Sequence, residues 1–179
     1  MADILKPRDD KDLAETVAKL AAANVAIEVK GAGTKRGIGR PITAATIIET
    51  SAMTGLTLYE PTELVMSARA GTPLAQIEAT LAERGQLLAF EPIDLGPISG
   101  GAGGQQTIGG VFATGASGPR RITSGAARDH ILGVKAVNGR GEIFKSGGRV
   151  LKNVTGYDVG RALVGSWGTL AILTELTFK

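Results

Sequence analysis

The chain has 179 residues, 26 of them glycine, and a formal net charge of +3. This length can bury one core or two small lobes that share an interface, and the small, dispersed charge argues against a nucleic-acid-binding protein. The chain contains no cysteine and one histidine, which excludes disulfides, iron–sulfur clusters, thiol catalysis and a multi-histidine metal site within these residues.

The N-terminal segment lacks the apolar stretch of a signal peptide. No run of about 18 consecutive apolar residues occurs that could form a transmembrane helix. We therefore expect a soluble, cytoplasmic protein. Aromatic residues are sparse, so alanine, valine, isoleucine and leucine are expected to form most of the core.

A helix followed by strands is predicted for the first part of the chain, up to about residue 57. Residues 10–23 carry apolar side chains at helical spacing, with Asp9 or Asp10 as the N-cap. The strands are predicted at residues 25–29, 44–50 and 56–59. The middle one is β-branched and mostly apolar, which is typical of a buried parallel strand.

The segment between the first two strands, KGAGTKRGIGRP at residues 30–41, is rich in glycine and in positive charge. Glycine lets the backbone approach a ligand closely and adopt positive φ, so successive N–H groups can converge on one anion. Four basic side chains stand beside those donors: Lys30, Lys35, Arg36 and Arg40. A diphosphate is the expected ligand, and a plain surface turn is the alternative.

This loop does not match the dinucleotide fingerprint of Rossmann proteins, which requires G-x-G-x-x-G at the start of a helix. Arg36 stands where the third glycine is needed, and the glycines and Pro41 that follow do not suit the first turns of a helix. The predicted helix also precedes the strand. We therefore predict a phosphate loop of helix–strand–loop type.

The second part of the chain begins with a short strand at residues 64–68. A helix follows, with Thr72 as its N-cap, Pro73 at its first position and Gly85 after its end. Residues 96–118 are too rich in glycine to hold regular structure throughout, although they include a short apolar run at 108–113.

The last part is dominated by strands. Strands are predicted at residues 131–137 and 142–144, joined by an Asn138-Gly139 hairpin turn. A short helix is expected around residues 158–163, and a final strand over residues 168–178.

The predicted fold class is therefore α+β with two lobes. A small parallel α/β lobe covers residues 1–60 approximately, and a larger lobe with an antiparallel sheet and flanking helices covers residues 61–179. Glycine loops from both lobes are expected to face one ligand.

Four segments taken together resemble the FAD-binding domain of the p-cresol methylhydroxylase/vanillyl-alcohol oxidase superfamily. They are GAGTK at 31–35, TIGG at 107–110 with ATGASG at 113–118, RDHILG at 128–133, and GSWGTLAILTE at 165–175. Their order and spacing match that family over nearly the whole chain. Within the superfamily, GRVLKNVTGYD at 148–158 is most similar to the FAD-binding subunit of bacterial glycolate oxidase.

The resemblance implies a role in FAD binding for each matching position. The amides of the first loop would hold the diphosphate: Gly31, Ala32, Gly33, Thr34 and Lys35. The second segment would line the flavin and ribitol: Gln106, Thr107, Ile108, Gly109 and Gly110. Further phosphate and ribityl contacts would come from Ala113, Thr114, Ser117 and Gly118. The adenine would be held by backbone hydrogen bonds from Gly168 to Ile172, on the last strand.

Two departures from the family pattern affect what we expect of the attachment of FAD and of the domain that covers the substrate. Some superfamily members attach FAD through a histidine near the first loop, which has none here, so we expect non-covalent FAD. Members also continue into a cap domain that covers the substrate. The chain ends where that domain should begin, so we expect an FAD module without a cap, inactive by itself.

Other polar and aromatic residues leave alternatives open, and no catalytic residue is assigned. His130 is expected to be structural or exposed rather than a general base. For the pairs Arg128–Asp129 and Arg120–Arg121, a structural or solvent-facing role is favoured over a contact with the cofactor. For Tyr157–Asp158, a role in capping and packing is favoured over one in the active site. Trp167 could wall the adenine or fill the interface between the lobes.

The resemblance implies a subunit of an FAD-dependent oxidoreductase acting on a 2-hydroxy acid, with glycolate as the expected substrate. Its partners would be a larger homologous flavoprotein subunit and an iron–sulfur subunit, which could also attach it to a membrane. The alternative is a non-catalytic assembly subunit with weak or no FAD binding. A pyridine-nucleotide binder is disfavoured by the broken fingerprint.

Overall fold

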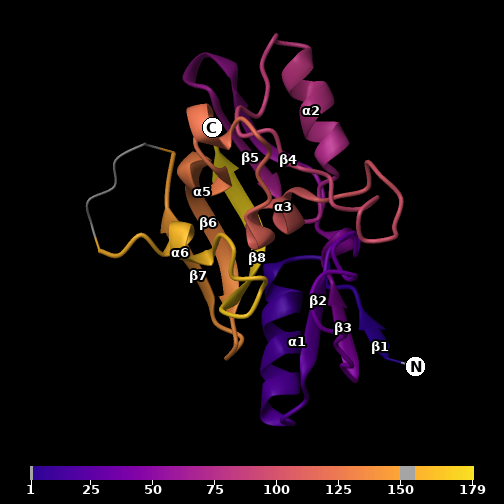
Figure 1. Cartoon of the computed structure of the whole chain (residues 1–179). Coiled ribbons are helices and arrows are strands. Elements are labelled where there is room, and N and C mark those ends of the chain that lie inside the picture. Colours follow the sequence, from indigo (N-terminus) through magenta and orange to yellow (C-terminus); the bar gives the residue numbers. More distant parts are fainter. Residues whose placement is uncertain (1, 150–155) are drawn as a thin grey trace.

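The computed structural model describes residues 2–149 and 156–179, which form two sheets with helices packed against them (Figure 1). The smaller sheet is parallel and has the strand order β1-β3-β2. The larger sheet is antiparallel and has the order β4-β5-β8-β6-β7. The predicted two-lobed α+β fold is confirmed.

The smaller sheet consists of β1 (Asp3–Leu5), β2 (Ile27–Lys30) and β3 (Thr46–Glu49). The central strand β3 is buried along its whole length, as its β-branched sequence predicted, whereas β2 is only half-buried. Strand β1 was not predicted, because its three residues are too few to show a periodicity.

Helix α1 (Asp10–Ala22) precedes β2. Asp9 is its N-cap, because the Asp9 carboxylate accepts hydrogen bonds of 2.9 Å from the backbone N–H groups of Lys11 and Asp12. Leu13 and Val17 point into a core that they share with Val137 of the larger sheet. Helix α1 thus joins the two sheets, as its position beside both in Figure 1 shows.

The larger sheet consists of β4 (Leu56–Glu60), β5 (Val65–Arg69), β6 (Ile131–Asn138), β7 (Ile143–Gly147) and β8 (Ala171–Phe178). The last strand, β8, lies in the middle, between β5 and β6. Strand β4 was assigned to the first lobe from the sequence, but it is the edge of this second sheet. The change of sheet therefore falls between β3 and β4, where the 3₁₀ turn η1 (Thr50–Ala52) lies.

Helices cover one face of the larger sheet and enclose the main core. They are α2 (Leu74–Ala82), α3 (Ile108–Thr114), α5 (Ala127–His130) and α6 (Val159–Leu163), whereas the short helix α4 (Arg121–Ser124) has no buried residue. Three fully buried phenylalanines lie at the centre of this core: the Phe112 ring centroid is 5.6 Å from that of Phe90 and 5.5 Å from that of Phe178. Such aromatic contacts add to the stabilisation from apolar burial.

Three local predictions need correction. Thr72 does not cap α2, because its hydroxyl donates to the Arg69 carbonyl at 2.7 Å; Pro73 occupies the N-cap position. The hairpin between β6 and β7 is longer than a two-residue turn, with Gly141 at a φ of 79°. Strand β8 begins at Ala171, so Gly168 precedes the strand.

A fourth finding concerns the glycine-rich stretch, in which α3 forms despite two glycines. Thr107 caps it through a 3.2 Å hydrogen bond from the Gly110 amide to the threonine hydroxyl. Gly109 is required because a Cβ there would lie 2.6 Å from the Ala70 carbonyl oxygen. Tertiary packing therefore overrides the low helix propensity of glycine.

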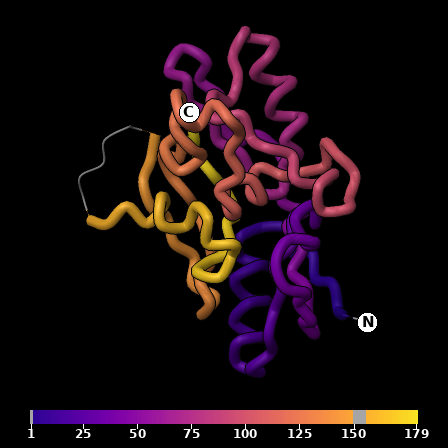
Figure 2. The backbone as a smooth tube through the Cα atoms, in the orientation of Figure 1, coloured from indigo at the N-terminus to yellow at the C-terminus, as the bar shows by residue number. Residues whose placement is uncertain are grey.

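Figure 2 shows that distant parts of the chain converge between the two lobes. The segment around residue 35, the pink and salmon segments near residues 95–115 and the yellow segment near residue 170 approach the same region. Within the described ranges, no helix is long and apolar enough to cross a bilayer.

Candidate functional site

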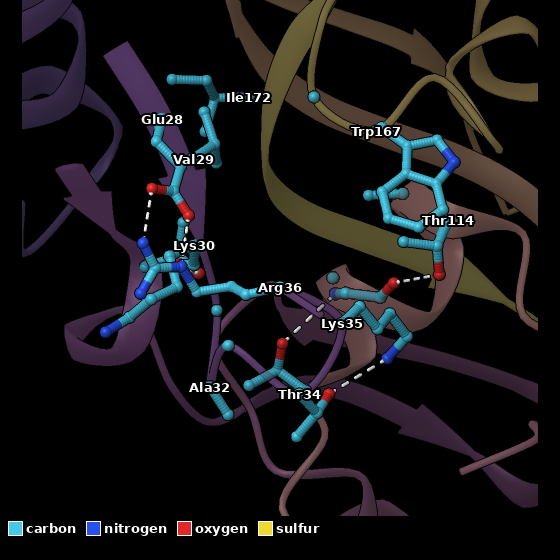
Figure 3. Close-up of a pocket in the computed structure, with 18 of the residues that line it drawn as sticks. Glu28, Val29, Lys30, Ala32, Thr34, Lys35, Arg36, Thr114, Trp167 and Ile172 are labelled. Carbon is cyan, nitrogen blue, oxygen red and sulfur yellow. Dashed lines mark hydrogen bonds and ion pairs between the residues drawn. The ribbon is translucent and has the colours of Figure 1, made fainter. Parts of the chain in front are cut away.

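A cavity of about 630 Å³ lies between the two lobes (Figure 3). Its walls come from β2 with the glycine loop that follows, from α3, and from the segment that leads into β8. Gly33, Gly109 and Gly168, which stand far apart in the sequence, all border it. The volume is in the range of cofactor and ligand sites in proteins.

The first glycine loop presents free backbone donors to this cavity. In the part of the chain that the structure describes, the N–H groups of Ala32, Gly33, Thr34 and Lys35 donate no hydrogen bond. Gly33 has a φ of 79°, a conformation that glycine adopts without strain. Successive unpaired amides in such a loop form an anion-binding site.

The loop is held against α3 by a close approach of the backbone. A Cβ at Gly31 would lie 2.5 Å from the Thr107 hydroxyl oxygen, so a side chain there would separate the loop from the helix. On the helix side, Gly109, Gly110, Ala113 and Thr114 line the cavity. Small residues at these positions keep the space between loop and helix open.

A second loop, residues 94–104, supports the first one from outside. The Asp94 carboxylate accepts hydrogen bonds from the amides of Gly96 at 2.9 Å and Gly104 at 2.6 Å, which lower the pKa of this carboxyl. The Ser99 hydroxyl donates to the Thr34 carbonyl at 2.6 Å. This support was not predicted from the sequence, although an aspartate before a glycine-rich turn is a recognisable signal.

The opposite wall is an open edge of the larger sheet. The Thr174 carbonyl accepts a 2.9 Å hydrogen bond from Ala70, just beyond the end of β5. The register of β8 on β6 shifts between Leu173 and Glu175, and Ile172 lies opposite Val137 of β6. Among the described residues, those of β8 before Thr174 have no strand partner on the β5 side. There β5 has ended and the cavity begins. Backbone groups at this position can pair with the edge of a planar heterocycle.

Trp167 and Gly168 form the turn that leads into this edge. Both have positive φ, 56° and 76°, and the Trp167 amide donates to the Ala113 carbonyl at 2.8 Å. Figure 3 shows the indole beside Thr114 on the cavity wall. A Cβ at Gly168 would lie 3.4 Å from the Cβ of Val29, so this turn packs closely on β2. Trp167 lines the cavity and is 48% exposed, so it is not a buried side chain of the interface between the lobes, and its contact with the adenine stays a prediction.

The basic side chains of the cavity wall differ in whether a carboxylate pairs with them. Lys30 binds Glu49 at 2.7 Å, and Arg36 binds Glu28 at 2.6 Å (Figure 3 shows the second pair). Lys30, Lys6 and Ser51 together lower the pKa of Glu49 to about 2. Burial lowers the pKa of the Lys35 ammonium, whose hydrogen bond goes to the Gln106 side-chain oxygen at 3.1 Å.

Most of the residues expected to bind FAD line the cavity. They are Gly31, Ala32, Gly33, Thr34, Lys35, Thr107, Gly109, Gly110, Ala113, Thr114, Gly168 and Ile172. The lining lacks Gln106, Ile108, Ser117 and Gly118.

Each of these four has a packing or hydrogen-bonding role near the wall. Gln106 is buried behind Lys35, and Ile108 is fully buried in the main core. The Ser117 hydroxyl accepts the Ala127 amide at 2.9 Å. Gly118 packs against the Glu91 backbone, where a side chain would not fit.

The other polar candidates lie outside the lining. His130 is buried, with its Nε2 atom 2.8 Å from the Ser124 carbonyl, and Asp129 accepts the Ala126 amide at 2.9 Å. Asp158 caps α6, while Tyr157 is 95% exposed. The remaining arginines are solvent-exposed: Arg120, Arg121 and Arg128.

The GRVLKNVTGYD segment is described only in part, because residues 150–155 lie outside the described residues. Conversely, Glu28 and Val29 of β2 line the cavity but were not predicted to do so. Their position directly before the glycine loop is the signal that could have identified them. Among the described residues, no group of three or more histidine, cysteine or acidic side chains is arranged to hold a metal ion.

The donor set fits a dinucleotide that carries a diphosphate. Unpaired amides and basic side chains lie on one wall, and an open strand edge with apolar neighbours lies on the other. An anionic group would bind the first wall, and a flat ring with polar edges would fit the second. FAD has both features.

Comparison with known proteins agrees with this geometry. A protein family described as an FAD binding domain matches residues 2–147. The chain is 41% identical to glycolate oxidase subunit GlcE of Escherichia coli (strain K12) over 167 residues, which cover 93% of the chain and 45% of that protein.

More distant relatives include the D-lactate dehydrogenase of Archaeoglobus fulgidus (strain ATCC 49558 / DSM 4304 / JCM 9628 / NBRC 100126 / VC-16), 30% identical over 98% of the chain and 38% of the relative. A solved structure of alkyldihydroxyacetonephosphate synthase shares the fold, with a TM-score of 0.76 at 22% identity over 98% of the chain and 31% of that structure. The chain thus spans less than half the length of these relatives. The family match over most of the chain shows that it belongs to the FAD-binding domain family of flavin oxidoreductases, and FAD is its cofactor.

Proposed function

We propose that this chain is the FAD-binding part of an oxidoreductase subunit that acts on a 2-hydroxy acid, with glycolate as the expected substrate. The observation that carries the proposal is the convergence of the first glycine loop, α3 and the edge of β8 on one cavity. The similarity to a protein named as a glycolate oxidase subunit supports the choice of substrate class.

The residues of this chain bind and orient the cofactor. The free amides of Ala32 to Lys35 bind the diphosphate, and backbone groups of the segment from Gly168 to Ile172 pair with the adenine. The flavin, when bound, supplies the chemistry by accepting two electrons from the substrate. Gly109, Gly110 and Ala113 of α3 line the cavity, and their small size lets the cofactor approach the helix backbone closely. This close contact positions the cofactor without a covalent bond.

We further propose that FAD is held non-covalently. The first loop carries no histidine, and the single histidine of the chain, His130, is buried outside the cavity lining. The remaining expected site residues support the cavity lining without being part of it. Gln106 accepts a hydrogen bond from Lys35, and the packing that positions α3 involves Ile108, Ser117 and Gly118.

The partners that we propose are a larger homologous flavoprotein subunit and an iron–sulfur subunit of a glycolate oxidase complex. The name of the relative GlcE describes a subunit of such an oxidase, which supports this assembly. The chain has no cysteine, so iron–sulfur ligands would come from another polypeptide. Any membrane association would also go through those partners.

Two measurements test the proposal. Titration of the purified chain with FAD, followed by acid precipitation, should give saturable binding and release of unmodified FAD. In the co-purified complex under anaerobic conditions, glycolate should bleach the flavin absorbance faster than D-lactate or D-2-hydroxyglutarate. A chain that binds no FAD would indicate a non-catalytic assembly subunit, and a flavin that glycolate does not reduce would reject the substrate assignment.

A further inference from the structure

Four basic side chains line the cavity, and Lys35 differs from the other three. Lys30 and Arg36 are neutralised by Glu49 and Glu28, and Arg40 is exposed to solvent. The Lys35 side chain is buried, with a residue exposure of 9%. Within the described residues, no carboxylate oxygen lies within 4.0 Å of its ammonium nitrogen.

The hydrogen-bond partners of the Lys35 ammonium are neutral. It donates to the Gln106 Oε1 atom at 3.1 Å and to the Thr34 hydroxyl at 3.4 Å. Gln106 is 3% exposed, and its backbone carbonyl accepts a 2.8 Å hydrogen bond from the backbone N–H of Leu74 at the start of α2. The glutamine side chain is therefore anchored in the larger lobe and fixes the ammonium at one place.

That place is the junction between the first loop and α3. The Nζ atom lies 3.9 Å from the position that a Cβ of Gly110 would occupy. Figure 3 shows the Lys35 side chain curving back beside Thr34, next to the amides of the first loop. The buried positive charge and the unpaired amides thus lie on the same wall.

A buried ammonium with only neutral partners is unfavourable, because desolvation is not offset by an opposite charge. The same desolvation lowers the pKa of Lys35, and the more distant Asp94 carboxylate only partly opposes it. An anion that enters the cavity beside the first loop would remove this imbalance.

We propose that the Lys35 ammonium is the internal counter-charge for the diphosphate of the bound dinucleotide, and that Gln106 is the positioning residue that holds it there. This inference rests on FAD binding to the cavity and adds a side-chain contact to the backbone amides. It implies that Lys35 lowers the stability of the empty domain and raises its affinity for the cofactor.

The opposing explanation is structural: Lys35 ties the loop to α3 through Gln106 and has no part in binding. The two explanations predict opposite changes in the stability of the empty domain when Lys35 is replaced. If Lys35 is structural, its replacement destabilises the empty domain. If Lys35 is a buried charge awaiting an anion, an apolar side chain of similar length stabilises the empty domain.

Lys35→Met removes the charge and keeps most of the side-chain volume. We expect the denaturation midpoint of the FAD-free chain to rise, and the dissociation constant for FAD to increase at least tenfold. Gln106→Glu leaves Lys35 in place but gives it a carboxylate at hydrogen-bonding distance. This variant should also weaken FAD at least tenfold, without loss of stability in the empty form.

Lys30→Met is the matched control, since Lys30 lines the same cavity but is already paired with Glu49. Its effect on FAD affinity should stay below threefold, and its empty form should be less stable than the wild type. Inorganic pyrophosphate provides a second probe: it should raise the thermal midpoint of the wild-type chain, and Lys35→Met should abolish this rise.

Several results would overturn the inference. FAD affinity unchanged in Lys35→Met would do so, as would a destabilised empty form of that variant or a pyrophosphate response that it retains. Equal weakening of FAD by Lys30→Met would assign the effect to general charge instead of to Lys35. If the wild-type chain bound neither FAD nor pyrophosphate, the cofactor site itself would be refuted along with this inference.

Discussion

The two lobes contribute to the cavity in different ways. The larger lobe has an extensive apolar core centred on Phe90, Phe112 and Phe178, and it places α3 and the edge of β8. The smaller lobe has a short parallel sheet whose strand β2 is only half-buried. Its core is completed by Val137 and Ile172 of the larger sheet. The larger lobe is therefore the scaffold, and the smaller lobe carries the charged loop.

This difference explains where the binding groups are found. A rigid core can hold backbone groups at fixed positions, as the segment of β8 that borders the cavity illustrates. The charged groups are on the smaller lobe or its loop: Glu28, Lys30, Lys35, Arg36 and Glu49. A substitution in the larger lobe should therefore act first on stability, and one in the loop should act first on affinity.

The largest effect is expected from the core of the scaffold. Phe112→Ala removes the ring that contacts both Phe90 and Phe178 and should lower the free energy of unfolding by about 3–5 kcal/mol. Urea denaturation followed by far-UV circular dichroism would measure this change. Ile122→Ala in the same lobe is the control, because Ile122 is 90% exposed and its loss should cost less than about 0.5 kcal/mol. Equal effects of the two substitutions would contradict the scaffold role.

An intermediate effect is expected in the loop and should appear in affinity instead of stability. Gly33→Asp places a carboxylate beside the diphosphate site and imposes a side chain at a φ of 79°. It should weaken FAD by about 100-fold, equivalent to about 2.7 kcal/mol. Isothermal titration of FAD would measure it, with circular dichroism to confirm that the fold is kept.

Gly39→Asp provides a control for strain and charge. Gly39 has a φ of 84° in the same loop, but it does not line the cavity and a Cβ there meets no atom within 4 Å. The strain and the added charge are thus similar in the two variants, and only Gly33→Asp should reduce affinity strongly. Similar losses in both would mean that the loop does not contact the cofactor at Gly33.

The smallest effect is expected from the ion-pair cluster at the end of β3. Glu49→Gln removes the contacts to Lys6 and Lys30 and should cost about 1–2 kcal/mol of stability at pH 7. The pKa of Glu49 is lowered from 4.5 to about 2 in the folded chain. Its stabilisation is therefore complete above about pH 4.5 and disappears as the pH falls to about 2.

Thermal melts of the two proteins between pH 7 and pH 2 would check this prediction. The wild type and Glu49→Gln should differ at neutral pH and converge near pH 2. Glu15→Gln, at an exposed position on α1, should run parallel to the wild type throughout. A gap that stays constant down to pH 2 would show that the charge of Glu49 does not stabilise the fold.

Local sequence signals predicted the elements that carry their own pattern. The amphipathic spacing of residues 10–23 predicted α1, the β-branched run predicted β3, and the alternating apolar segments predicted β6 and β8. The resemblance of four glycine segments to a known family supplied the cofactor. The signals for the helix and strands each lie within a dozen or so neighbouring residues, whereas the resemblance depends on the order and spacing of four segments along the chain.

The elements that the sequence analysis missed depend on distant partners. Strand β1 exists because it pairs with β3, and α3 tolerates two glycines because Gly109 packs on Ala70 and Thr107 caps the helix. Strand β4 joins the second sheet through its pairing with β5. In each case, the contacts that decide the outcome come from another part of the chain.

The amino-acid sequence by itself determined that a glycine-rich, basic loop follows the first predicted strand, because glycine and lysine are recognisable without any knowledge of the fold. The tertiary structure showed that the amides of this loop are unpaired. Only the tertiary structure decided which charges remain available: Glu28 and Glu49 neutralise Arg36 and Lys30, while Lys35 is buried against a neutral glutamine from the other lobe. The physical reason is that the energy of a charge depends on its burial and its partners, and both are set by residues distant in the sequence.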